Sequence, residues 1–367
     1  MVTRKKRRTV AVPEQPSGTL AIQMPPEKAE PASIGNVLMM VVPMLGSTGV
    51  MVFMSMQNPE NSRAMLMGGG MLVAMLGMVG FNMYRQFSQY RTRVKTQRRE
   101  YLSYLTETRE SVRKVAKKQR AYYNWVYPSP DALVTLAANG SRLWSREGNT
   151  YDLLTFRYGS GTQPLGLIFE RPPIDPMTEM DVVCLSAMER FIGVHDHTDN
   201  VGKFLYLGDF SHIEVVGDGE SAYDEMRAIM MHLACFIDPS KLKIAVLCSA
   251  DRLGDWEWVK WMPQARSSIV RDAVGPGRMI STDPRELAEM IGPDIAMRGA
   301  YRPGDDMPEW PHLLLVCDGA EFPPNSPFGS AVGVRGVTIM SRAREWTPMK
   351  SHTALRLVIH PNPDHKG

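Results

Sequence analysis

A short glycine-containing loop could bind phosphate in the C-terminal half of the chain. Gly217, Gly219 and Ser221 lie between an apolar run and a helical pattern. Backbone N–H groups of such a loop, together with a helix N-terminus, can hold an anion. The phosphate loop of nucleotide hydrolases also needs a lysine and a following hydroxyl residue. This loop lacks that lysine, and its carboxylates at Asp218 and Glu220 would repel a polyanion.

Asp318 is the second residue that could act on a nucleotide. It ends the apolar run His312–Asp318, where a carboxylate of a Walker B strand would support Mg²⁺. Gly319 stands where such strands often carry a catalytic acid. We therefore expect a degenerate site for ATP and Mg²⁺, with no catalytic residue and no hydrolysis by this domain alone. An ATPase with an atypical phosphate loop is the alternative. The candidate nucleotide-binding residues are Gly217, Gly219, Ser221 and Asp318.

A tryptophan-rich run, from Asp255 to Pro263, is the most distinctive stretch of the sequence. It holds three tryptophans within six residues. Aromatic clusters of this kind form either a docking surface or a buried packing cluster. We expect a structural or docking role for Trp256, Trp258, Lys260 and Trp261.

No metal site is expected. The run from His195 to Asp199 holds potential ligand types, but no fourth ligand has a supporting spacing, and a polar loop explains it as well. The four cysteines lie among apolar neighbours without a C-x-x-C pair, which is typical of core residues in a reducing compartment.

Alternating strand and helix patterns follow residue 213. Near-continuous apolar strands separated by helices predict an α/β fold whose parallel sheet is covered on both faces. We assign residues 213–367 to a degenerate, P-loop-NTPase-like α/β domain and residues 141–212 to a strand-rich region. The expected strands are 213–217, 243–248, 312–318, 336–340 and 355–359, and the expected helices are 222–236 and 284–291.

Two long apolar runs within residues 34–84 predict a pair of transmembrane helices. Each run reaches the roughly 20 residues that a spanning helix needs. Basic residues flank the pair on both sides, which predicts that both termini lie in the cytoplasm. Residues 1–33 are assigned to a cytoplasmic tail, in which 18–26 alternates apolar and polar residues and could add as a strand to a partner or to a later domain.

Residues 85–140 predict a helical stalk. Charged residues dominate its first forty residues, no glycine or proline interrupts them, and a thin apolar seam recurs at a seven-residue step. Its basic side chains suit anionic headgroups beside a membrane. No DNA-reading module accompanies them, so no nucleic-acid partner is expected.

Several runs of the sequence together form a recognisable pattern. They are Trp256-Glu257-Trp258-Val259-Lys260-Trp261-Met262-Pro263, Leu143-Trp144-Ser145-Arg146, Asp152–Gly159, Val216-Gly217, Met226-Arg227-Ala228 and Asp272-Ala273-Val274-Gly275-Pro276-Gly277-Arg278. With the features above, they resemble the EccC family, the FtsK/SpoIIIE-type coupling ATPases of mycobacterial type VII (ESX) secretion systems. Gln264 and Ser145 depart from the usual family pattern, which has His and Glu at those positions.

The resemblance implies a specific setting. Family members act in an inner-membrane complex with EccB, EccD and EccE, which implies an inner-membrane location, and further EccC copies give a hexameric assembly. This stretch would match the N-terminal portion, which anchors and couples a multi-module secretion ATPase. Secreted substrates would be bound only by modules beyond this chain. A membrane-anchored FtsK-like DNA translocase is the alternative function.

Overall fold

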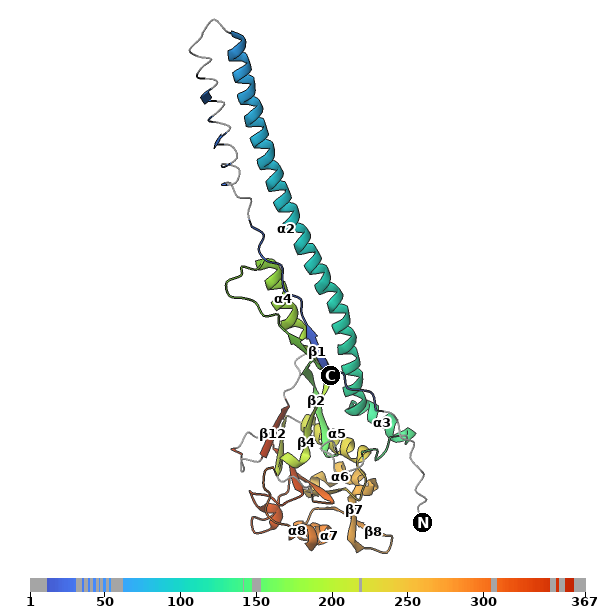
Figure 1. Ribbon diagram of the computed structural model, residues 1–367. Helices are drawn as coiled ribbons and strands as arrows, with labels where there is room; N and C mark the ends of the chain where they lie inside the picture. Colours follow the sequence, from blue (N-terminus) through green and yellow to red (C-terminus); the bar gives the residue numbers. More distant parts are fainter. Residues whose placement is uncertain are drawn as a thin grey trace. The chain divides into compact units, whose positions relative to one another are not determined.

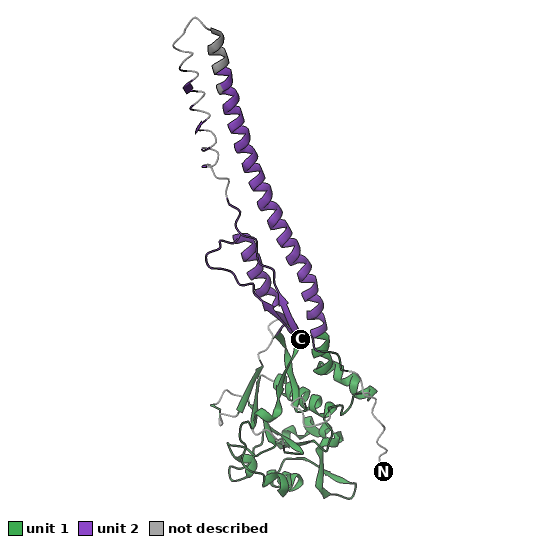
Figure 2. Cartoon of the chain, viewed as in Figure 1, with its two compact units in different colours: residues 1–14, 120–163, 199–367 green, residues 15–119, 164–198 purple. Residues whose placement is uncertain are grey.

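The structure is a computed structural model, and Figure 1 shows its elements. It describes residues 12–30, 62–140, 142–146, 153–217, 220–304, 309–343, 348–349 and 354–359, with isolated positions between 35 and 53. The chain divides into two compact units (Figure 2). Unit 1 comprises residues 1–14, 120–163 and 199–367, and unit 2 comprises residues 15–119 and 164–198.

A six-stranded parallel sheet forms the centre of unit 1. Its strands pair in the order β12-β5-β11-β10-β6-β9, so that β11 separates β5 from β10. Because the strands are parallel, the carboxyl ends of β5, β11 and β10 lie at the same edge of the sheet. The strands are β5 (His212–Gly217), β6 (Leu242–Cys248), β9 (Ile280–Ser281), β10 (His312–Asp318), β11 (Val337–Ala343) and β12 (Ala354–Ile359).

Both faces of this sheet carry an apolar core. One core joins α5 (Ser221–Phe236) and Trp256 to inward-facing residues of the central strands. The other joins α7 (Pro284–Ile291) and two phenylalanines of the segment after β10. Strand β10 is buried along its whole length, as its uninterrupted apolar sequence requires. The prediction of an α/β fold with a covered parallel sheet is confirmed.

Shorter elements complete unit 1. Strands β2 and β4 pair with each other, and β7 and β8 form an antiparallel pair. The elements are α3 (Pro130–Asn139), β2 (Thr155–Pro164), β4 (His197–Tyr206), α6 (Leu253–Trp256), η3 (Glu257–Trp261), β7 (Arg266–Arg271), β8 (Pro276–Arg278) and α8 (Pro293–Ala296).

Unit 2 is built on a long helix, α2 (Ser62–Val126), whose residues 62–119 belong to this unit. Strand β1 (Gly18–Ala21) pairs in parallel with β3 (Leu167–Glu170). The predicted strand in the N-terminal tail is therefore present. Helix α4 (Val182–His195) begins at Asp181, whose carboxylate accepts from the N–H groups of Val183 and Cys184 and also binds Arg98 at 2.8 Å.

The predicted transmembrane pair over residues 34–84 is wrong, and so is the inner-membrane location with two spans. Among the residues that the structure describes, no helix is long and apolar enough to cross a membrane. Helix α2 is continuous from Ser62 to Val126. From Arg85 the helix continues into charged sequence. Most of the first apolar run lies outside the described residues.

Candidate functional site

The parallel sheet brings two of the predicted nucleotide-site residues to one edge. Gly217 ends β5 and Asp318 ends β10, with β11 between them, and Ser221 is the first residue of α5. Gly219 lies outside the described residues. A Cβ at Gly217 would lie 3.0 Å from the Oγ of Ser221 and 3.2 Å from the Cβ of Ile359. Glycine is therefore needed here for close packing, whether or not an anion binds.

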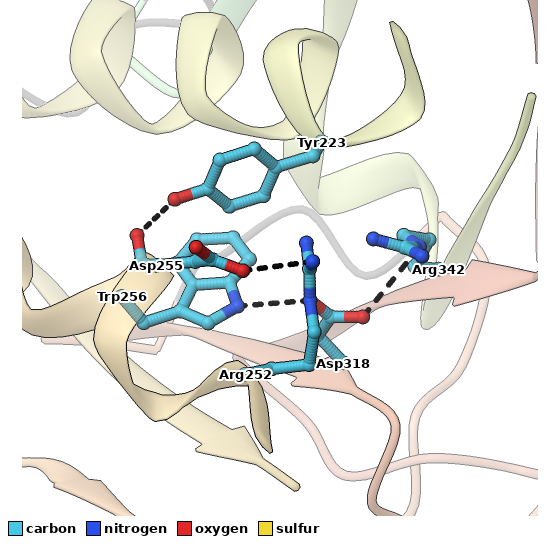
Figure 3. A network of polar contacts seen from close by, with 6 residues as sticks. All are labelled: Tyr223, Arg252, Asp255, Trp256, Asp318 and Arg342. Atoms are coloured by element: carbon cyan, nitrogen blue, oxygen red, sulfur yellow. Dashed lines mark hydrogen bonds and ion pairs between the residues drawn. The ribbon is translucent and has the colours of Figure 1, made fainter. Parts of the chain in front are cut away.

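Asp318 lies at the centre of a buried polar cluster (Figure 3). Its Oδ2 accepts hydrogen bonds from Arg252 Nε at 3.1 Å and from Trp256 Nε1 at 3.0 Å. Its Oδ1 lies 3.6 Å from Nε of Arg342, which comes from the neighbouring strand β11. We call Asp318, Arg252, Trp256, Arg342, Asp255 and Tyr223 the Asp318 cluster.

Local backbone contacts hold the cluster in place. The N–H of Ser249, just after β6, donates to the carbonyl of Asp318 at 3.0 Å. Gly319 follows with φ of +76°, and a Cβ there would lie 2.5 Å from the Oγ of Ser249. Only glycine fits both constraints without strain. The residue that stands where a catalytic acid often lies is therefore required by the turn.

Aromatic packing closes the other side of the cluster. Trp256 is fully buried, and the Tyr223 ring meets its edge with ring centroids 4.9 Å apart. The Tyr223 hydroxyl donates to the backbone carbonyl of Asp255. These contacts connect the start of α5 to α6, so the position of Trp256 Nε1 depends on both helices.

The charges of the cluster compensate one another. The Asp318 side chain is only 3% exposed and faces two guanidinium groups. Arg252 also binds Asp255 at 2.7 Å. Burial opposes the charge of Arg252, but its hydrogen bond to Asp318 and the nearby carboxylates raise its pKa above the usual value. Arg252 is therefore firmly cationic, and the Asp318 carboxylate is both hydrogen-bonded and paired with arginine.

This arrangement does not fit Mg²⁺ at Asp318. Magnesium needs carboxylate oxygens that can face the ion or its water shell. Here an arginine lies beside each Asp318 oxygen, and a divalent cation at either would be repelled by a guanidinium charge. A structural role for Asp318 is favoured over metal support, and nucleotide binding near Gly217 stays a prediction.

The tryptophan-rich run separates into a buried and an exposed part. Trp256 is buried, and Trp258 stacks against it with ring centroids 6.4 Å apart. Trp261 is 85% exposed, and Lys260 forms an ion pair with Glu257 at 2.7 Å. Packing therefore explains Trp256 and Trp258, whereas Trp261 and Lys260 are available to a partner.

Comparison with known proteins finds relatives that are named as ESX secretion system proteins. No protein-family model matches the chain. An ESX secretion system protein EccC of Thermomonospora curvata is 31% identical over 363 residues, which are 98% of this chain and 27% of the relative. The ESX-3 secretion system protein EccC3 of Mycobacterium tuberculosis is 29% identical over 347 residues, covering 91% and 25%. The chain belongs to the EccC family. It spans about a quarter of the length of these curated relatives.

The predicted resemblance to EccC is thus confirmed, and other relatives agree with it. The ESX-5 secretion system protein EccC5 of Mycobacterium marinum is 28% identical over 339 residues, covering 89% of this chain and 24% of the relative.

In this EccC-family chain, sequence reasoning missed both arginines that bind Asp318. Arg252 lies four residues before Trp256, a spacing that places two side chains on one face of a helical turn and could have indicated a shared partner. Arg342 gave no local signal. Its position beside Asp318 depends on the register of β11 against β10, which pairs Ser341 with Cys317.

Proposed function

We propose that the chain serves a type VII (ESX) protein-secretion machine as an ATPase-like module that docks and couples but does not hydrolyse ATP. The observation that carries this proposal is the closed Asp318 cluster. The residue in the magnesium-supporting position is bound by Arg252, Arg342 and Trp256. The family relationship supports the secretion setting.

Three parts of a nucleotide-hydrolysing site differ from what the chemistry needs. Phosphoryl transfer requires a cationic cradle, a metal ion and a group that orients the nucleophile. The loop after β5 has no phosphate-loop lysine, Asp318 is neutralised by arginines, and the following position is a glycine held by its turn. A docking and coupling role uses the fold without needing these parts.

Its proposed partners are EccB, EccD and EccE together with further EccC copies. The exposed Trp261 beside Lys260 supplies one docking surface, because a large exposed aromatic residue is typical of an interface anchor. Trp261→Ala should reduce co-purification of the chain with these subunits. Val274→Ser is a matched control, since Val274 is 96% exposed in the β7–β8 connection. Equal recovery of the complex with wild type and with Trp261→Ala would show that Trp261 does not form a docking surface.

Hydrolysis is tested with the purified full chain. We expect no Mg²⁺-dependent release of phosphate from ATP by wild type, and the same result for Asp318→Asn. Calorimetry with ATP, with and without Mg²⁺, measures binding separately. Turnover by wild type that Asp318→Asn abolishes would overturn the non-hydrolysing assignment and favour the ATPase with an atypical phosphate loop.

A further inference from the structure

The C-terminal end of α2 is held by three arginines within unit 1. The last carbonyls of a helix have no partner inside the helix, and they form the negative end of its dipole. Here three consecutive carbonyls each accept a hydrogen bond from a different guanidinium group. The bonds are Arg142 Nη2 to Trp125 O at 2.7 Å, Arg146 Nη2 to Val126 O at 3.0 Å, and Arg157 Nη1 to Tyr127 O at 2.8 Å.

These three residues, the arginine clamp, come from separate parts of the chain. Arg142 and Arg146 follow α3, whereas Arg157 lies in β2. Aromatic rings stack on the bonded groups. The Arg142 guanidinium lies 3.7 Å from the Trp125 ring centroid, and the Tyr127 ring stacks on Phe204 with centroids 4.4 Å apart. Cation–π and stacking contacts add to the three hydrogen bonds that hold the last turn of α2 in unit 1.

The same segment also binds the C-terminal end of α5. The N–H of Trp144 donates to Cys235 O at 2.7 Å, and the N–H of Arg146 donates to Phe236 O at 3.1 Å. Arg146 Nη2 also lies 3.3 Å from Nε2 of His232. Because a guanidinium can only donate, Nε2 is the acceptor and the imidazole is neutral. The clamp therefore joins the ends of two helices, α2 and α5.

The opposite end of α5 belongs to the Asp318 cluster. Tyr223, in the first turn, contacts Trp256 and donates to the carbonyl of Asp255. The helix has 16 residues, a length of about 24 Å. Its core-facing residues are buried against the sheet, so it moves as one rigid element. We therefore expect a displacement of His232 to displace Tyr223 as well.

A cavity beside the clamp holds a second possible acceptor for Arg157. The cavity has a volume of about 160 Å³ and is lined by Arg157, Ser160, Glu225, Ala228 and His232, among others. Among the residues that the structure describes, Glu225 Oε1 and His232 Nδ1 are buried without a hydrogen-bond partner. If Arg157 exchanged the Tyr127 carbonyl for the Glu225 carboxyl, the end of α2 would lose a hydrogen bond. The unpartnered oxygen of Glu225 on α5 would gain one. Such an exchange of acceptors would give the joint two arrangements.

We propose that the arginine clamp couples the last turn of α2 to the Asp318 cluster, with α5 as the rigid connection and Arg157 as the group that changes partner. This goes beyond the proposed function, because it assigns a path to the coupling. The path holds whether or not the chain hydrolyses ATP. Arg142, Arg146 and Arg157 are positioning residues in it.

Hydrogen exchange on the full chain tests the path. In Arg157→Gln we expect exchange to rise about tenfold at two separated places, residues 122–126 of α2 and residues 221–224 with 252–256, as a typical coupling between sites predicts. Exchange in α7 should stay at the wild-type rate. Arg285→Gln, on the exposed surface of α7, is the matched control. A rise confined to residues 122–126 would overturn the proposal.

The reciprocal variant separates coupling from general loss of stability. Coupling between sites acts equally in both directions. Asp318→Asn should therefore raise exchange at residues 122–126 without raising it in α7. In the double variant, Arg157→Gln with Asp318→Asn, the combined change should differ at least fivefold from the product of the single changes. A simple product, or a uniform rise that includes α7, would show that the two sites are independent and overturn the proposal.

Discussion

Two acids, Asp318 at the end of β10 and Glu225 on α5, are treated in opposite ways by the fold. The Asp318 carboxylate has two hydrogen-bond donors and a second arginine beside it. Glu225 has a buried oxygen with no partner among the described residues, and burial raises its pKa to about 7, while the charge of Arg157 acts in the opposite direction. Both acids lie close to arginines, but only one is hydrogen-bonded to them. The two acids therefore differ in whether hydrogen-bond donors reach the carboxyl oxygens, which burial and nearby charge alone do not decide.

The largest effect is expected where the Asp318 cluster loses its aromatic wall. Trp256→Ala removes a fully buried ring and a donor to Asp318, and should lower the free energy of unfolding by about 3–5 kcal/mol. Chemical denaturation monitored by circular dichroism measures it. Trp261→Ala is the control, because Trp261 is 85% exposed and should change stability by less than about 0.5 kcal/mol. Similar losses in both variants would mean that the run is not divided into a core and a surface part.

Removing Asp318, whose charge the two arginines balance, should give the next largest loss of stability. Asp318→Ala leaves the largely buried Arg252 and Arg342 without the carboxylate that they share and should cost about 3 kcal/mol of stability. Asp255→Ala removes a partner of the same Arg252, but the Asp255 side chain is 43% exposed, so its loss should stay below about 1 kcal/mol. A loss below that of Asp255→Ala would show that the arginines do not depend on Asp318.

Replacing Glu225, the acid whose buried oxygen has no partner among the described residues, should raise stability rather than lower it. The raised pKa of Glu225 means that the folded state favours the neutral carboxyl, so this contribution to stability is present below pH 4.5 and is lost as the pH rises to about 7. The ionisable groups that share its cavity are Arg157 and Tyr158 of β2 and His232 of α5. Glu225→Gln keeps the neutral shape and should be more stable than wild type by roughly 2 kcal/mol at pH 8.

That gain should disappear near pH 4.5, where wild-type Glu225 is itself protonated. Thermal melts at both pH values measure the difference, with Asp224→Asn as an exposed neighbouring control. A gain that is equal at both pH values would show that the carboxyl charge is not its cause.

The smallest effect is expected at the surface of the tryptophan-rich run. Lys260 pairs with Glu257 across one exposed turn, where water and salt screen the attraction. Lys260→Ala should therefore leave the melting temperature unchanged, although it can still affect docking. A clear fall in melting temperature would mean that the exposed part of the run also stabilises the fold.

Local patterns in the sequence determined much of unit 1. The apolar runs ending at Gly217, Cys248 and Asp318 became parallel strands, and residues 222–236 became a helix with its apolar side on the sheet. These features depend on side-chain periodicity and turn residues within a few positions of each other. The runs that carry the resemblance to EccC are likewise recognisable in the sequence without the tertiary structure.

The tertiary structure decided which of these residues meet. Strand register placed Arg342 beside Asp318, and packing against α5 buried Trp256 while leaving Trp261 exposed. The transmembrane prediction was wrong, since no helix among the described residues is long and apolar enough to cross a membrane. Charge compensation and exposure depend on partners far apart in the chain. The sequence by itself named the acid at the strand end, and only the folded sheet supplied the arginines that make it structural.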